Sequence, residues 1–565
     1  MKIVKEAAEL VAAAVGCDLK IALANTDLSN KFGDISSTIA FEIAKAEKKN
    51  PTTIAAEIAN KIKLTKNFNN VVAHGPYINF YFSDEFYSSL IESIITEKEN
   101  FGRLKKNGKK IMVEYFDANT HKGVHIGHIR NISLGEAICR VLEFNGNEVI
   151  RVNYQGDIGP HVAKCLWGFI NIYREKEPNV EQKGVWLGKV YAEASKKIAE
   201  KKELEREVLD INIKLYSREK HITELWQKTR QWCLDDFKKF YDEFGVKFDE
   251  FFFESETEKI GKEIALDMLS KGIARKDDGA VIVDLREENL GICVLLTKEG
   301  YPLYPAKDLG LAKLKFEKYN NLDRSIHVVG KEQEFYFKQL FKIFEKAGMK
   351  KAAEVSYHLI YELVMLPEGK MSSREGTMVL YEELKEKLLS KTINEVKSRH
   401  PDWDMERVYK TAKTIALAAI KFSMLRRENN RVLVFDWEKA LSLEGDSGPY
   451  LQYAYVRTEG ILKKAHYEAI VSPGYHFNDD EKKLLKNLLF FEKAVRATEA
   501  SLSPHIICDY LLDLAAELNR FYSTCRVINA EKQEERETRL AIILATNTIL
   551  KNSLSIIGVE VPDMM

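Results

Sequence analysis

The stretch His125-Ile126-Gly127-His128 marks the change from a strand to a helix. Before it, residues 111–116 (Ile-Met-Val-Glu-Tyr-Phe) are rich in β-forming side chains. After it, residues 134–142 carry apolar side chains at the spacing of one helix face, and Asn145-Gly146-Asn147 ends that helix. Residues 148–154 then predict a second strand. This order predicts a right-handed βαβ unit of the nucleotide-binding type.

The His-x-Gly-His turn is suited to a phosphate. The backbone N–H groups and the dipole at the start of a helix favour an anion, and Gly127 lets a nucleotide approach the backbone. His125 and His128 can donate to phosphate oxygens as negative charge builds. The alternatives are a metal-binding pair or two surface histidines. No carboxylate or cysteine cluster at metal-ligand spacing is nearby in the sequence, which favours the phosphate.

A second informative stretch, Lys370-Met371-Ser372-Ser373-Arg374, follows strand-like residues 359–364 and precedes Gly376. Lys370 and Arg374 can neutralise a leaving pyrophosphate. Alone, such a tract is an ordinary polar turn. Together with the first motif it predicts ATP-dependent activation of a carboxylate.

Composition narrows the class of protein. The chain of 565 residues is too long for one core, so about three domains are expected, and 45% hydrophobic with 30% charged residues is typical of a globular protein. A net charge of zero argues against electrostatic wrapping of nucleic acid but allows local basic surfaces. The seven cysteines form no Cys-x-x-Cys pair, so we expect no structural metal and a reducing cytosol. No apolar run approaches 18 residues, which predicts no membrane span.

Residues 1–107 predict a small α/β domain. Asn50 is expected to cap a helix that begins at Pro51. Strand alternation in residues 77–82 puts Ile78, Phe80 and Phe82 on the core face, and leaves Tyr77, Asn79 and Tyr81 on the other.

Residues 108–380 predict a Rossmann-like, parallel-sheet catalytic domain. A helical insertion at about 165–275 is expected between two half-sheets, with strands resuming at 280–283, 293–296 and 326–329. Residues 381–565 predict an all-α domain. The fold class is therefore α/β with an all-helical C-terminal domain.

These motifs resemble the class I aminoacyl-tRNA synthetases, and among them the arginyl-tRNA synthetases. The resemblance spans essentially the whole chain. It is carried by residues 113–131, 370–377, 420–427, 435–437, 445–454 and 514–522. It implies a ligase that uses L-arginine, tRNA(Arg) and ATP with Mg²⁺, acting as a monomer in the cytoplasm. It also implies an N-terminal domain that binds the tRNA elbow and a C-terminal domain that binds the anticodon.

The resemblance implies a pocket for arginine. A guanidinium has five donors and no acceptor, so it needs carboxylates, amide oxygens and a flat aromatic ring. Tyr304 and Asp308 lie four apart where Pro305 opens a helix, although ordinary helix-start chemistry would explain them too. Glu114 and Asn119 are expected at the α-amino end of the substrate. The full set of pocket residues is Glu114, Asn119, Glu254, Tyr304, Asp308 and Gln333.

Three departures from the family pattern stand out. Ser373 occupies the place of the second lysine of the general class I loop, and Lys122 is expected to supply the missing charge. The segment Glu332–Tyr336 lacks the histidine that often follows the glutamine. Pro160-His161 stands where many relatives have other residues.

The resemblance also implies contacts with RNA. Tyr77 and Asn79 would stack on and hydrogen-bond a base at the tRNA elbow. The alternative is that their face is covered and Asn79 bonds a neighbouring loop. Arg520, Tyr522 and Met565 are candidates for anticodon contacts, or in the case of Arg520 and Tyr522 for helix packing.

Other functions fit the sequence less well. Charging with cysteine is disfavoured by the absence of zinc-binding cysteines and by the acidic pocket, and glutamine is a further alternative within the class. An inactive RNA-binding scaffold would not need His125, His128 and Lys370. A small-molecule nucleotidyltransferase would not need the N- and C-terminal domains.

Overall fold

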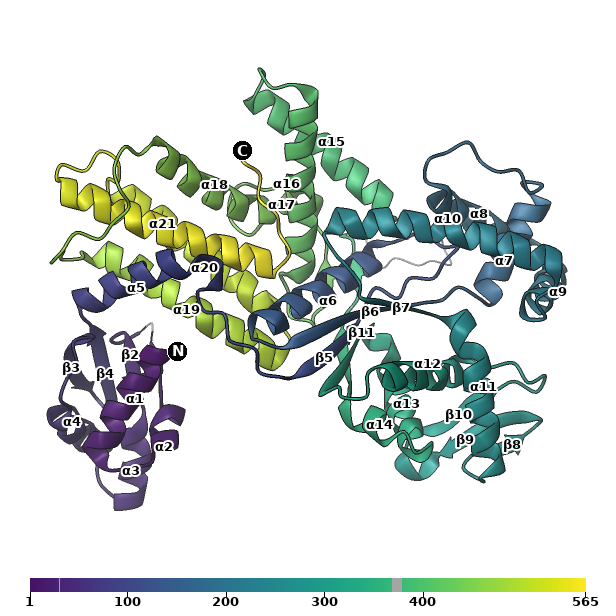
Figure 1. The fold of residues 1–565 in the computed structure, drawn as a ribbon, viewed down its shortest axis with the longest axis horizontal. Coiled ribbons are helices and arrows are strands. Elements are labelled where there is room, and N and C mark those ends of the chain that lie inside the picture. Colours follow the sequence, from purple (N-terminus) through teal and green to yellow (C-terminus); the bar gives the residue numbers. More distant parts are fainter. Residues whose placement is uncertain (30, 368–378) are drawn as a thin grey trace.

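The chain forms a small N-terminal α/β unit, a central part built on a parallel sheet, and a C-terminal layer of long helices (Figure 1). The computed structural model describes residues 1–29, 31–367 and 379–565. The loop residues Lys370, Met371, Ser372, Ser373 and Arg374 lie outside this described part. The predicted fold class is confirmed.

The N-terminal unit has a four-stranded antiparallel sheet in the order β1-β2-β4-β3. As predicted, the Asn50 side chain caps a helix by accepting from the Thr52 N–H, and Pro51 opens that helix. The elements are α1 (Lys2–Val15), α2 (Leu19–Ala24), β1 (Thr26–Leu28), β2 (Ile35–Ser37), α3 (Ile39–Glu47), α4 (Pro51–Lys61), β3 (Phe68–His74), β4 (Tyr77–Phe82) and α5 (Asp84–Glu97).

Strand β4 shows the predicted alternation with one correction. Ile78, Phe80 and Phe82 are buried, and Tyr77 and Tyr81 are exposed. Asn79 shares the face of the two tyrosines but is 0% exposed. The loop between β1 and β2 covers it, and a Cβ atom on Gly33 would lie only 2.9 Å from the Asn79 Cβ. The expectation of an open face around Asn79 is therefore wrong.

The central sheet has five parallel strands in the order β12-β11-β5-β6-β7. The predicted βαβ unit is confirmed as β5, α6 and β6. The elements are β5 (Lys110–Glu114), α6 (Ile126–Phe144), β6 (Glu148–Gln155), β7 (Glu250–Phe253), β11 (Arg324–Gly330), η3 (Lys331–Gln333) and β12 (Ser356–Tyr361).

The helical insertion is shorter than predicted. Its helices are α7 (Pro160–Asn171), α8 (Lys183–Glu200), α9 (Leu204–Tyr216) and α10 (Lys220–Phe244). Strand β7 lies within the predicted 165–275 range but pairs with β6 at the edge of the parallel sheet. A four-residue strand with Phe252 buried and Phe251 exposed carries too short a pattern to stand out in the sequence.

Strands 280–285 and 291–296 do not continue the parallel sheet, contrary to the prediction. They form a separate antiparallel sheet in the order β10-β9-β8. Asp278 and Gly279, both at positive φ, make the tight turn between β8 and β9. The elements are α11 (Glu254–Ser270), β8 (Arg275–Asp277), β9 (Ala280–Leu285), η2 (Arg286–Glu288), β10 (Gly291–Leu296), α12 (Tyr304–Lys318), α13 (Glu334–Lys346) and α14 (Lys350–Val355).

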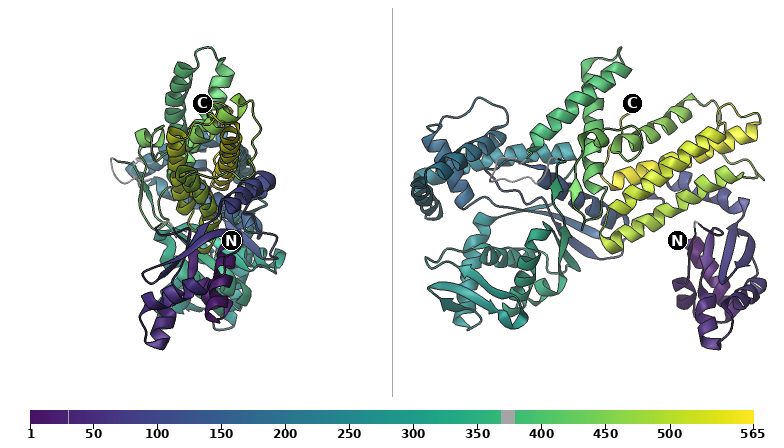
Figure 2. Two further views of the ribbon diagram at one scale, coloured as in Figure 1. Left: turned by 90° about the vertical axis from the view of Figure 1, so that its left-hand side faces the viewer. Right: turned by 180° about the vertical axis from the view of Figure 1, so that it is seen from behind.

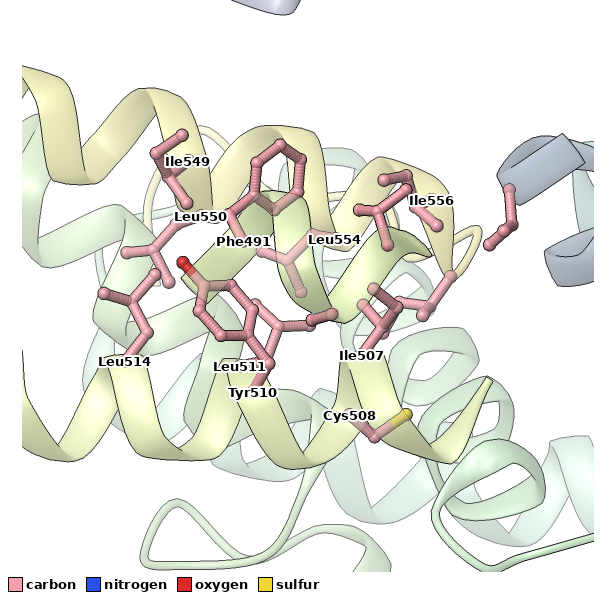
Figure 3. Packing of buried hydrophobic residues seen from close by; sticks show 14 of the residues in the cluster. Phe491, Ile507, Cys508, Tyr510, Leu511, Leu514, Ile549, Leu550, Leu554 and Ile556 are labelled. Carbon is pink, nitrogen blue, oxygen red and sulfur yellow. The ribbon is translucent and has the colours of Figure 1, made fainter. Parts of the chain in front are cut away.

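The C-terminal part is helical, as predicted, apart from the two-residue strand β14, which pairs with β13. Figure 3 shows its core, in which Phe491 of α19 and Leu514 of α20 lie among side chains of α21. The elements are β13 (Val364–Met365), α15 (Tyr381–Arg399), α16 (Met405–Leu425), β14 (Leu433–Val434), α17 (Trp437–Ala440), α18 (Gly448–Lys464), α19 (Asp479–Ser501), α20 (His505–Thr524) and α21 (Gln533–Ile556).

The end of α10 joins the central and C-terminal parts, which lie side by side in Figure 1 and in the right-hand view of Figure 2. Arg140 of α6 donates to the carbonyl oxygens of Gly245 and Ser555, each at 3.0 Å. Lys421 of α16 is buried; its ammonium donates to the Phe244 carbonyl at 2.8 Å and to a carbonyl just beyond α21 at 2.7 Å. Two cations thus satisfy the free carbonyls at two helix ends. Among the described residues, no helix is both long and apolar enough to span a membrane.

Candidate active site

The loop between β5 and α6 brings the His125–His128 turn to the carboxyl edge of the parallel sheet. Thr120 N–H donates to the Gly156 carbonyl at 2.9 Å, which ties this loop to the one after β6. Ile126 N–H donates to Val379, and Tyr381 N–H donates to Val124 at 2.8 Å. The turn is therefore held between two neighbouring loops at the edge where α/β folds bind ligands.

The two histidines of the turn cap α6 reciprocally. His125 Nδ1 accepts from the Gly127 N–H at 3.1 Å, and His128 Nδ1 accepts from the His125 N–H at 3.2 Å. Their rings stack with centroids 3.7 Å apart. Because each Nδ1 is an acceptor, each neutral ring carries its proton on Nε2. The turn therefore presents two ring N–H donors.

Burial keeps these rings neutral. Burial and the nearby Lys122 ammonium lower the pKa of His125 to about 4. Burial, with His125 and Lys122 beside it, lowers the pKa of His128 well below its usual value. At neutral pH both histidines act as hydrogen-bond donors rather than as cations. Gly127 is required sterically as well, since a Cβ atom there would lie 3.0 Å from the His125 ring.

Lys122 lies half-buried next to the turn. Its ammonium is 5.4 Å from the centroid of the Tyr191 ring, and Lys164 lies 5.8 Å from the same centroid. Burial and the neighbouring Lys164 lower the pKa of Lys122. The structure thus places a partly desolvated cation beside His125, where an anionic substrate would be attracted.

A cavity of about 350 Å³ adjoins the turn between α10 and α15, and Lys122, Glu243 and Tyr381 are among its lining residues. Glu243 accepts from the Tyr381 hydroxyl at 2.6 Å and from Lys385 at 3.2 Å. Leu380, next to Tyr381, forms an antiparallel bridge with His125. Glu243 thereby fixes the segment that flanks the histidine turn.

Asn119 and Glu254 meet beside Gly156. A Cβ atom on Gly156 would lie 2.0 Å from Asn119 Oδ1 and 3.6 Å from the Glu254 carboxyl carbon. Glu254 is buried at the start of α11, and its Oε2 lies 2.7 Å from the Lys307 ammonium. Burial raises the pKa of Glu254 although Lys307 opposes it. An amide, a carboxylate and an ammonium thus lie together at these predicted site residues.

Asp308 lies one helical turn after Tyr304 on α12. It accepts a short hydrogen bond from the Tyr336 hydroxyl. Burial and the carboxylates of Glu114 and Glu254 raise the pKa of Asp308 to about 7, against the effect of the tyrosine. Tyr304 is 66% exposed at the rim, and Gln333 is exposed in η3 at the end of β11. These two are therefore more exposed than Asp308, which is half-buried.

Glu114, which is predicted at the α-amino end of the substrate, is 4% exposed. Its Oε1 is 2.6 Å from His327 Nδ1, and its Oε2 pairs with the Lys315 ammonium. Burial alone would raise its pKa, but Lys315 and His327 lower the pKa of Glu114 to about 2. Both carboxylate oxygens are occupied, so contact with a substrate would have to displace one of these partners.

Several polar residues of the site were not predicted. Lys315 follows Asp308 by seven residues, two turns along the same face of α12, so helical spacing could have revealed it. Lys307, His327 and Tyr336 carry no such signal, because their contacts join residues from different elements. Among the described residues, no group of three or more His, Cys, Asp or Glu side chains is arranged to hold a metal ion.

The candidate RNA contacts lie far apart. Tyr77 is exposed and packs edge-on against Phe41, with ring centroids 5.6 Å apart. Arg520 pairs with Asp480 at 2.8 Å, and the Arg457 guanidinium lies 3.8 Å from the centroid of the Tyr522 ring. Met565 packs against the cluster between α15 and α16 that contains Trp403.

Comparison with known families accounts for nearly the whole chain. Residues 2–82 match the arginyl tRNA synthetase N terminal domain. Residues 90–437 match the catalytic domain of tRNA synthetases class I (R), and residues 451–565 match the DALR anticodon binding domain.

Known proteins agree with these matches. The chain is 36% identical over 560 residues to the arginine–tRNA ligase of Bdellovibrio bacteriovorus, covering 97% of this chain and 95% of that protein. It is 32% identical to the arginine–tRNA ligase of Clostridium acetobutylicum, covering 93% of both. The Thermus thermophilus arginyl-tRNA synthetase structure superposes with a TM-score of 0.82 at 26% identity, covering 100% of both chains. This chain therefore belongs to the arginyl-tRNA synthetase family of class I aminoacyl-tRNA synthetases.

Proposed function

We propose that this chain activates L-arginine with ATP and transfers it to the 3′ end of tRNA(Arg), giving arginyl-tRNA, AMP and pyrophosphate. Family membership along the entire chain is the observation that carries this conclusion. The match includes the parts at both ends, which a small-molecule nucleotidyltransferase would not need.

In the first step, a carboxylate oxygen of arginine attacks the α-phosphorus of ATP, and the bond to pyrophosphate breaks. Negative charge grows on the phosphate oxygens, and the Nε2–H groups of His125 and His128 donate to it. One such donor is worth about 2.7–4 kcal/mol in the transition state. In the second step, a hydroxyl of the terminal ribose attacks the arginyl carbonyl carbon, and AMP leaves.

The guanidinium of arginine binds between the carboxylates of Asp308 and Glu254, with the Tyr304 ring at the rim. Asn119 binds the end that carries the α-amino group, and Gln333 completes the set of pocket residues. Glu114 acts on that end through its charge and through the position of β5, because Lys315 and His327 occupy its oxygens.

Charge on the leaving pyrophosphate is neutralised by Lys370 and Arg374, with Met371, Ser372 and Ser373 completing their loop. Lys122 supplies the cation that the family's second lysine would bring at position 373. Its partly buried site next to His125 supports this role. ATP enters as its magnesium complex, and the chain works as a monomer in the cytoplasm.

The two ends of the chain bind tRNA. In this proposal residues 1–107 bind the elbow through Tyr77, while Asn79 supports the β4 strand from within. Residues 381–565 bind the anticodon arm, with Arg520, Tyr522 and Met565 as candidate contacts. Residues 108–380 form the catalytic domain between them.

Pyrophosphate exchange with each of the twenty amino acids, with and without tRNA(Arg), tests the function. Among the twenty amino acids, we expect only arginine to support exchange. We expect tRNA(Arg) to increase the rate of that exchange. Exchange with another amino acid, or no exchange with arginine in the presence of tRNA(Arg), would refute the assignment.

A further inference from the structure

Tyr336 contacts Asp308 of the predicted arginine pocket. It belongs to helix α13, which contributes none of the predicted pocket residues. It lies in the first turn of α13, directly after the η3 segment that contains Gln333. Its ring packs edge-on against Phe337, with centroids 5.6 Å apart. Its hydroxyl donates to Oδ2 of Asp308.

The bond leaves one oxygen of Asp308 for a ligand. Among the described residues, no hydrogen bond reaches Asp308 Oδ1. A carboxylate that accepts a fixed bond on one oxygen cannot rotate freely, so its other oxygen keeps one direction. Tyr336 thereby fixes the direction of Oδ1, the Asp308 oxygen that no described residue bonds.

We propose that Tyr336 is a specificity-determining positioning residue: its hydroxyl holds the Asp308 carboxylate so that Oδ1 receives the guanidinium of the substrate. The inference rests on the proposed function, since it requires arginine to bind at Asp308. It adds a residue that selects for a cationic planar group without itself touching the reacting atoms.

The groups around Asp308 determine how strongly this hydrogen bond affects the charge of its carboxyl group. The charged groups that face it are Glu114 of β5, Asp117 of the following loop, Glu254 of α11 and Lys315 of α12. Its other titratable neighbours are Tyr336 of α13, Tyr154 of β6, Cys293 of β10 and Tyr304 of α12. Burial and the Glu114 and Glu254 carboxylates disfavour a further negative charge on Asp308, Lys315 opposes this effect, and the tyrosine donor offsets another part of that cost.

The hydrogen bond from Tyr336 should make arginine binding depend on pH. Burial already raises the pKa of Asp308 to about 7, and the Tyr336 hydroxyl lowers that pKa. Without the hydroxyl the pKa rises further, so at pH 7 more of the carboxyl is protonated and neutral. A neutral carboxyl is a poor partner for a guanidinium. The loss in arginine binding should therefore be largest near pH 6–7 and shrink toward pH 9.

Tyr336→Phe in the full-length chain tests the proposal by arginine-dependent pyrophosphate exchange with tRNA(Arg) from pH 6 to 9. We expect KM for arginine to rise about 10- to 100-fold at pH 7, the loss typical of one hydrogen bond to a charged group. The rise should be smaller at pH 9. The KM for ATP and the kcat at saturating arginine should stay within about twofold. An arginine KM that is unchanged, or raised equally at every pH, overturns the proposal.

Two further variants distinguish the loss of the hydrogen bond to Asp308 from a general structural effect of removing a tyrosine hydroxyl. Tyr319→Phe is the matched control, because the Tyr319 hydroxyl donates to Glu250 at 2.9 Å outside the pocket. It should leave the arginine KM unchanged. Tyr336→His keeps a ring donor and should recover part of the affinity, which also covers the case in which Tyr336→Phe does not fold. No recovery by the folded histidine variant counts against the proposal. Wild-type protein that fails to activate arginine would instead refute the proposed function.

Discussion

Replacing Lys315 with methionine would leave the Glu114 carboxylate buried without its ammonium partner. The side chains are 1% and 5% exposed, so solvent cannot replace the lost partner. Removing one member of such a buried pair costs about 3–5 kcal/mol. A domain of roughly this size loses about 2–4 °C in Tm per kcal/mol, so the catalytic domain's transition should fall by about 6–20 °C.

Differential scanning calorimetry of Lys315→Met and of the double variant with Glu114→Gln measures this effect. The double variant removes both charges and should recover more than half of the lost Tm, because the carboxylate left without its ammonium partner causes most of the loss. A single variant within about 2 °C of wild type, or a double variant no better than the single one, would refute the reasoning.

The same pair predicts a dependence on acid. The pKa of Glu114 is about 2 in the folded chain, below its ordinary value of 4.5. A carboxyl whose folded pKa is lowered stabilises the fold above the unfolded pKa, and this contribution is lost as the pH falls from 4.5 toward 2. The wild type should lose stability in that window. The double variant should lose less, which acid titration followed by circular dichroism would check.

Five other variants address the catalytic turn and the RNA surface. Lys122→Ala should lower the rate of pyrophosphate exchange about 10²–10³-fold, which is the loss expected from one transition-state donor. Ser373→Lys in that background should restore part of the rate. A normal rate in the single variant contradicts the role of Lys122. Gly127→Ala should lower the exchange rate, since the added methyl would press on a histidine ring 3.0 Å away; unchanged exchange would show that the ring can move. Tyr77→Ala should raise the KM for tRNA. Asn79→Ala should lower the Tm and leave that KM nearly unchanged, because Asn79 is buried. Charging kinetics and thermal melts on both variants measure these effects, and the reverse pattern would contradict the prediction.

Local signals predicted the elements but not all of their partners. The β5–α6–β6 unit follows from alternation, helical spacing and the Asn145-Gly146 stop, all of which lie in adjacent residues. Strands β9 and β10 were recognised as strands and assigned to the wrong sheet, because the choice of sheet depends on pairing with residues remote in sequence. Strand β7 was missed because four residues carry too little periodicity.

In the candidate site, too, the sequence identified some residues but not the contacts between them. Asp308 and Glu254 could be named because a resemblance to a family assigns residue types to positions. The salt bridge of Lys307 with Glu254 could not, because it joins two helices. Asn79 shows the limit of alternation, which gives the face of a side chain and not what covers it.

The junction at the end of α10 has a consequence for the order in which the molecule is completed. Arg140 lies in α6, the helix that begins at the histidine turn. It is separated by 415 residues from Ser555, one of its two carbonyl acceptors. At a synthesis rate of about 5–20 residues per second, roughly 20–80 s pass between the two. Until then the acceptor just beyond α10 and the acceptor in the last turn of α21 cannot both be present. The helix that carries the histidine turn is among the early products of translation, yet its surroundings are finished only when the last helix leaves the ribosome.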